Sequence, residues 1–131
     1  MEIHLIIIGL FFIPLGLVHI VFPKQFNWKQ ELKSLSVINK DMMYVHTFFI
    51  AITIFLVGIL CLTSATDLIN TTFGKRISLG LGIFFSLRLL AQFFGYSSIT
   101  WKGKTQETVI HVIFSLFWAY VALIFILIFT C

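Results

Sequence analysis

The chain has 131 residues, of which 60% are hydrophobic and only 11% are charged, and its mean hydropathy is +1.06. A soluble domain carries about 25% charged residues, so this composition excludes an ordinary water-soluble protein. Sixteen Phe residues with only two Pro argue against a disordered chain. The net charge of +4 resides mainly in the segments between apolar stretches, which indicates membrane topology and anionic lipid rather than nucleic acid.

Four apolar stretches predict four transmembrane helices, at about residues 3–22, 42–63, 77–96 and 108–130. Each stretch approaches the ~20 residues that an α-helix needs to cross ~30 Å of hydrocarbon. Backbone groups in lipid must be satisfied internally, and the alternation typical of barrel strands is absent. The sequence therefore predicts a single domain over residues 1–131, an all-α integral membrane protein folded as an up-down four-helix bundle.

Basic residues are distributed unevenly between the loops. The second loop carries two, Lys75 and Arg76, whereas the first and third loops together carry six: Lys24, Lys29, Lys33, Lys40, Lys102 and Lys104. The positive-inside rule then predicts that the first and third loops lie in the cytoplasm and that both termini lie outside the plasma (inner) membrane. Four aromatic residues fall at the same predicted boundary, as in an aromatic belt: Trp28, Tyr44, Tyr96 and Trp101.

The first loop has a hydrophobic pattern of its own. Trp28, Leu32, Leu35 and Ile38 recur at helical spacing, and most polar residues lie off this stripe. The pattern predicts a short amphipathic helix between the first and second spans, lying in the cytoplasmic interface or docked on a partner. The second loop, residues 64–76, is short and polar, and we expect Gly74 at a turn there.

Six polar side chains inside or beside the predicted spans fall near one membrane depth. They are His19, His46, Arg88, Gln92, Glu107 and His111. At ~1.5 Å per residue the three histidines lie ~5–6 Å below the cytoplasmic interface. Gln92 lies at a similar level in the third span, so all four spans contribute a polar group to one layer. Ionisable groups within membrane helices usually face the bundle interior or a cavity. The layer predicts a site for a buried polar or metallic ligand, and the alternative is a structural network in which Arg88 pairs with Glu107.

Haem b is the leading ligand that this layer predicts. In an up-down bundle the second and fourth helices are diagonal, so His46 and His111 would face each other as axial ligands for electron-transfer work. Arg88 would neutralise the propionates, and His19 or Gln92 would bind them. The alternative is a single Zn, Fe or Cu ion held by the three histidines of the layer, His19, His46 and His111.

Two further hypotheses need no metal. The chain would be a quinone- or lipid-binding protein: a quinone headgroup near the interface would accept hydrogen bonds from the His, Arg or Gln side chains, with Glu107 or His111 as a proton relay. Alternatively, the chain is a small accessory subunit whose Phe-rich faces pack on partner membrane subunits or on a second copy in a homo-oligomer. Cys61 and Cys131 form no CxxC motif and are interpreted as small packing residues. With no GxSxG, HExxH or Gly-rich phosphate loop, the sequence predicts no particular reaction.

The predicted orientation is testable by thiol labelling of intact cells. With Cys61 and Cys131 replaced by Ala, a single cysteine from Lys33→Cys or Lys102→Cys should resist an impermeant reagent, because its loop is cytoplasmic. A cysteine from Thr71→Cys should react. The opposite labelling pattern would reverse the orientation.

Overall fold

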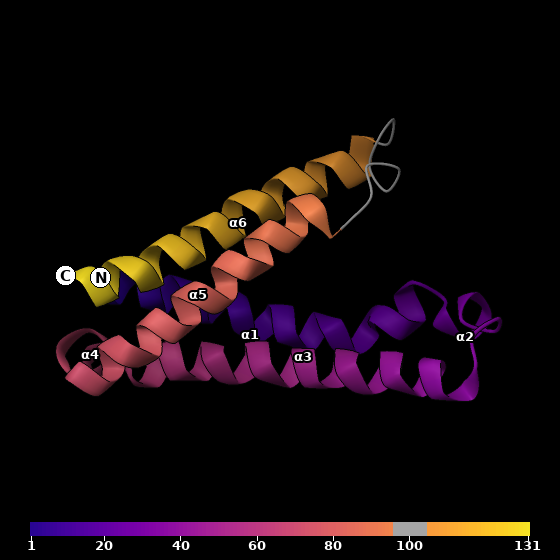
Figure 1. Cartoon of the computed structure of the whole chain (residues 1–131), viewed down its shortest axis with the longest axis horizontal. Helices are drawn as coiled ribbons and strands as arrows, with labels where there is room; N and C mark the ends of the chain where they lie inside the picture. Colours follow the sequence, from indigo (N-terminus) through magenta and orange to yellow (C-terminus); the bar gives the residue numbers. More distant parts are fainter. Residues whose placement is uncertain (96–104) are drawn as a thin grey trace. The chain divides into compact units, whose positions relative to one another are not determined.

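The computed structural model describes residues 1–95 and 105–131, and these ranges contain helices and no strand. The helices are α1 Glu2–Gln25, α2 Trp28–Glu31, α3 Val37–Thr63, α4 Ala65–Asn70, α5 Thr72–Phe94 and α6 Thr105–Thr130 (Figure 1). By length and composition, α1, α3, α5 and α6 are long and apolar enough to cross a membrane. The predictions of an all-helical chain and of four apolar helices are therefore confirmed.

The helices fall into two compact units. One contains residues 3–65, with α1, α2 and α3, and the other contains residues 1–2 and 66–131, with α4, α5 and α6. The long helices begin before the predicted apolar windows, and N-caps rather than hydropathy fix two of these starts. Ser36 caps α3 and Thr71 caps α5. The up-down arrangement of all four long helices stays a prediction.

In the first unit, α1 and α3 run side by side and approach closely at glycines (Figure 1). A Cβ on Gly9 would lie 2.8 Å from the carbonyl oxygen of Gly58, and one on Gly16 would lie 2.8 Å from that of Ala51. The two contacts are one heptad apart on each helix. Small residues at such positions let helix backbones meet in lipid, where no hydrophobic force drives helices together.

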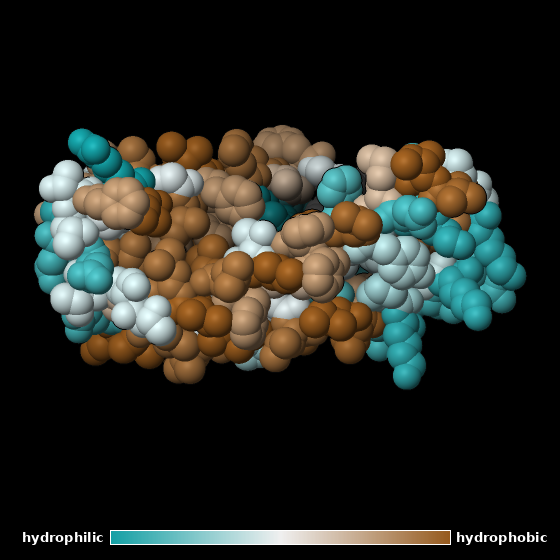
Figure 2. All heavy atoms as spheres, turned by 90° about the horizontal axis from the view of Figure 1, so that it is seen from below, coloured by the Kyte–Doolittle hydropathy of each residue, from teal (hydrophilic) through white to brown (hydrophobic). Residues whose placement is uncertain are grey.

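The segment between α1 and α3 differs from the predicted amphipathic helix. α2 has only four residues, and α3 begins just after Ser36, whose Oγ accepts a hydrogen bond from the Asn39 N–H (3.4 Å). Ile38 consequently belongs to α3, and the prediction of one helix from Trp28 to Ile38 is wrong. A serine N-cap starts a new helix wherever it satisfies the first N–H groups, whatever the hydrophobic spacing around it. Figure 2 shows hydrophilic residues gathered at the end of this unit that carries α2.

In the second unit, α5 and α6 pack through stacked aromatic rings. The Phe85 ring lies 5.6 Å from the Trp118 ring and 6.0 Å from the Phe125 ring, with interplanar angles of 8° and 16°. All three side chains are buried. Next to this stack, a Cβ on Gly82 would lie 2.8 Å from the Ile126 side chain, so the two helices also approach closely here. Aromatic packing thus holds the middle of the α5–α6 pair.

Gly74 lies in the first turn of α5 and not at a turn between elements, so the prediction for this residue is wrong. The Gly74 N–H donates to Thr71 Oγ1 (2.8 Å), and Thr71 Oγ1 donates to the Asp67 carbonyl oxygen (2.6 Å). A Cβ on Gly74 would collide with that same carbonyl oxygen and would lie 2.6 Å from Leu68 Cα. Glycine is therefore required by the close approach of the α4 backbone.

Substitution of Gly74 should destabilise the fold, because the obstructing atoms are backbone atoms that cannot turn away. We expect Gly74→Ala to cost about 1–3 kcal/mol. Gly80→Ala is the matched control: its Cβ would meet nothing within 4 Å, so it should be neutral or stabilising by up to about 1 kcal/mol. Helicity followed through an SDS titration measures both. Equal stabilities of the two variants would contradict the close approach.

Candidate functional site

A chain of hydrogen bonds links three polar side chains of α5 and α6. Arg88 Nη1 donates to Gln92 Oε1 (3.2 Å), and Gln92 Nε2 lies 2.9 Å from His111 Nδ1. Gln92 is only 6% exposed, and Arg88 and His111 are half-buried. The structure thus brings together three residues of the predicted layer, and Gln92 is the link between its partners.

Arginine fixes the direction of this chain because a guanidinium donates hydrogen bonds and never accepts them. The Gln92 carbonyl oxygen must therefore face Arg88, and its NH₂ group must face His111. An NH₂ group only donates, so Nδ1 of a neutral His111 ring accepts and the ring proton lies on Nε2. In this arrangement Nε2 of a neutral His111 ring carries a proton rather than a lone pair.

Aromatic rings surround the same residues. The Arg88 guanidinium carbon lies 5.1 Å from the centroid of the Trp118 ring, within the range of a cation–π contact. The Phe93 and His111 rings meet edge to face at 5.9 Å. The Trp118 ring in turn stacks on Phe85. The polar chain therefore runs along a largely aromatic surface of the α5–α6 pair, which favours flat, unsaturated ligands.

The histidines of the α1–α3 unit are placed differently. The His19 ring is half-buried, lies 4.6 Å from the Phe22 ring, and has its Nδ1 2.7 Å from the Leu15 carbonyl oxygen. A carbonyl only accepts, so Nδ1 carries the proton and the lone pair lies on Nε2. The ring thus has the tautomer opposite to that of His111. His46 is exposed on α3.

The remaining predictions for the layer have mixed outcomes. Glu107 is exposed in the first turn of α6, one turn from His111 on the same helix face, and its ion pair with Arg88 stays a prediction. Among residues 1–95 and 105–131, no group of three or more His, Cys, Asp or Glu side chains is placed to hold a metal ion. Cys61 is buried and Cys131 is exposed, and both are free thiols.

Sequence reasoning missed the aromatic half of this site. Its signal was present: Phe85, Arg88 and Gln92 have i, i+3, i+7 spacing, and Trp118 follows His111 by seven residues. A tryptophan deep inside a span, away from the interfacial belt, marks such a face. No protein-family model, curated protein or solved structure matches the chain. The chemistry of these residues must therefore carry the functional proposal.

The two opposite tautomers are directly measurable. In protein labelled with ¹⁵N-histidine, at a pH where imidazoles are neutral, His19 should carry its proton on Nδ1 and His111 on Nε2. Gln92→Leu removes the amide that selects the His111 tautomer, so His111 should become a mixture while His19 stays unchanged. A wild-type His111 protonated on Nδ1 would show that the chain does not run from Arg88 through Gln92.

Proposed function

We propose that this small membrane protein binds a membrane-soluble ligand with acceptor oxygens, of the quinone class, at Arg88, Gln92 and His111 on α5 and α6. The observation that carries the proposal is the direction of the hydrogen-bond chain, in which Arg88 donates to Gln92 and Gln92 donates to His111. Donors arranged along an apolar surface select for carbonyl oxygens rather than for metal ions, which need lone pairs.

The surroundings support an aromatic or quinonoid ring. Pockets for small ligands are mostly apolar and aromatic, with a few placed polar groups that fix orientation. Phe93, which is 51% exposed and contacts His111, supplies an accessible aromatic surface here, whereas Trp118 is buried and contacts Arg88. A quinone ring would lie against Phe93 while its oxygens accept hydrogen bonds from Arg88 or His111.

The cost of the polar chain also supports a ligand. Ionisable side chains in spanning helices are expensive and are usually functional. The competing explanation is that Gln92 only joins α5 to α6, since hydrogen bonds between membrane helices contribute about 0.6 kcal/mol on average. A joining role explains the amide, but it does not require a guanidinium at the other end of the amide.

Haem b or a single metal ion remains a second candidate, favoured by His19 rather than by His111. The Nδ1–H of His19 bonded to a backbone carbonyl is the arrangement that orients metal-binding imidazoles. It leaves the Nε2 lone pair for iron, zinc or copper. His111 would have to give up its hydrogen bond with Gln92 to serve in the same way.

The experiment compares two probes that differ only in their oxygens. Menadione, a methylnaphthoquinone, and 2-methylnaphthalene are titrated into the detergent-purified chain, and tryptophan fluorescence and calorimetry report binding. We expect saturable binding of menadione only. Arg88→Leu and His111→Leu should each weaken it about tenfold, because each removes a donor. His4→Ala and Arg76→Gln, which alter polar residues elsewhere in the chain, should leave the affinity unchanged.

Three outcomes separate the candidates. Equal binding of both probes, or an Arg88→Leu variant with unchanged affinity for menadione, would overturn the quinone proposal. A Soret band or bound metal in the purified protein that His19→Ala removes and His4→Ala retains would favour the second candidate instead. Purification only together with other chains would favour the accessory-subunit hypothesis.

A further inference from the structure

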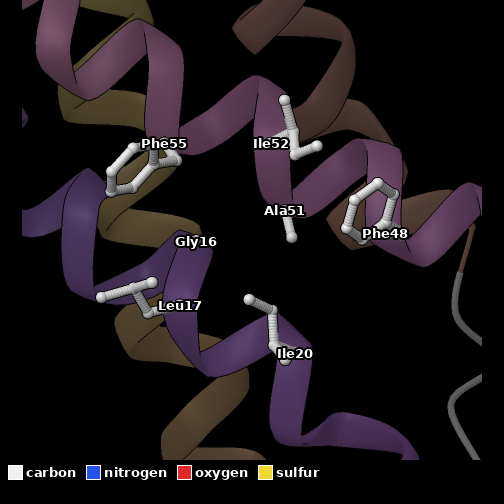
Figure 3. A pocket seen from close by; sticks show the side chains of 7 residues that line it. All are labelled: Gly16, Leu17, Ile20, Phe48, Ala51, Ile52 and Phe55. Atoms are coloured by element: carbon white, nitrogen blue, oxygen red, sulfur yellow. The ribbon is translucent and has the colours of Figure 1, made fainter.

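The α1–α3 unit has a half-open apolar cavity of about 220 Å³. Figure 3 shows side chains from both helices around it, with those of Leu17 and Ile20 on α1 facing those of Phe48 and Phe55 on α3. Seven residues line it: Gly16, Leu17, Ile20, Phe48, Ala51, Ile52 and Phe55. The cavity lies beside Gly16 and Ala51, where the backbones of α1 and α3 meet closely.

The lining determines what kind of group fits. None of the seven side chains carries a hydrogen-bond donor or acceptor, so the part of a ligand that lies inside must be hydrocarbon. The volume is below the ~300–1,000 Å³ of pockets for drug-sized ligands, which favours a narrow chain over a ring system. Half-open apolar grooves on a membrane helix pair face a solvent made of acyl chains.

Basic residues continue the faces that line this groove. Lys24 follows Ile20 by four residues on α1, and Tyr44 and Lys40 precede Phe48 by four and eight residues on α3. Residues four apart lie on one face of a helix, so the groove leads to two lysines at the same end of the unit. Lys24 is exposed and Lys40 is half-buried.

An aromatic pair lies between the apolar groove and the charged end. The Trp28 and Tyr44 rings meet edge to face at 5.4 Å, and Trp28 is 8% exposed. Tryptophan and tyrosine mark the level of the headgroups in a bilayer. Along the unit, the apolar groove is followed one turn on by Tyr44 and Lys24 and two turns on by Lys40. This runs from apolar to aromatic to charged, as a phospholipid runs from acyl chain through glycerol region to phosphate.

We propose that the α1–α3 unit binds one anionic phospholipid, with an acyl chain in the groove and the phosphate at Lys24 and Lys40. The charge at this end is net positive: Lys29 and Lys33 are also exposed here, against Glu31 and Asp41. The N-terminus of α3 adds a favourable dipole for phosphate. This site is separate from the residues on α5 and α6 and does not depend on the proposed quinone ligand.

Native mass spectrometry of the full chain tests the proposal. The protein is released from micelles containing equal amounts of phosphatidylglycerol and phosphatidylcholine with identical acyl chains. We expect one retained phosphatidylglycerol per chain. Lys24→Gln and Lys40→Gln should each reduce the preference for phosphatidylglycerol about fivefold at low salt. Lys75→Gln, which removes the same charge from the second unit, should not.

A groove-filling variant separates the acyl-chain site from surface charge. Leu17→Trp fills the groove and should abolish retention of the lipid. Leu10→Trp is its control, because Leu10 is on the same helix, one heptad away, and is 59% exposed against 53% for Leu17, but does not line the groove. Identical retention in the two tryptophan variants, or equal retention of both lipids by the wild-type chain, would overturn the proposal. Retention of a neutral isoprenoid in place of phosphatidylglycerol would overturn it as well.

Discussion

Helices in lipid gain nothing from burying apolar surface against each other, and four helices as apolar as α1, α3, α5 and α6 would meet this constraint in a bilayer. Each helix pair must then be held together by close van der Waals packing or by polar contacts. In the first unit, Gly9 and Gly16 admit the α3 backbone to close contact with α1. In the second unit, the Phe85 ring stacks on the Trp118 ring. The buried Gln92 amide also contacts Arg88 and His111, and so links α5 to α6. Both pairs approach closely at glycine, since Gly82 also brings α5 near α6. The second pair adds stacked rings and a buried amide, so the two pairs leave different surfaces for ligands.

The residues that pack each helix pair also determine which kind of ligand that pair suits. Small residues that let α1 and α3 meet leave an apolar hollow beside Gly16 and Ala51, which suits hydrocarbon. Large aromatic residues fill the α5–α6 core with buried rings, and in such a low-dielectric environment the few donors are strengthened. A polar chain directed by a guanidinium in such an environment selects for acceptor oxygens. In each pair, the side chains that pack the two helices are thus also the ones that set the proposed ligand preference.

The sequence predicted the helical class and the four apolar helices, because hydropathy over about 20 residues is a strong signal. It failed at Ile38 and Gly74, where local hydrogen bonds of Ser36 and Thr71 determine the helix starts. Depth counting found Arg88, Gln92 and His111, but it did not indicate which ring nitrogen of each histidine carries the proton. The opposite tautomers of His19 and His111 depend on single partners, a carbonyl and an amide, and helical periodicity carries no information about such partners.

Chain order alone relates the two proposed sites to the membrane. Gln92 and His111 lie near the ends of α5 and α6 that flank the third loop, and Ile20 and Phe48 lie near the ends of α1 and α3 that flank the first. In any chain whose four long helices all cross the bilayer, the first and third loops share one side, whatever the packing between the units. Both sites then belong to one leaflet, the one with six of the eight basic loop residues. That leaflet is also where an anionic phosphate is attracted most strongly, so the lysines of the loops would enrich anionic lipid in the leaflet that a membrane-soluble ligand would share.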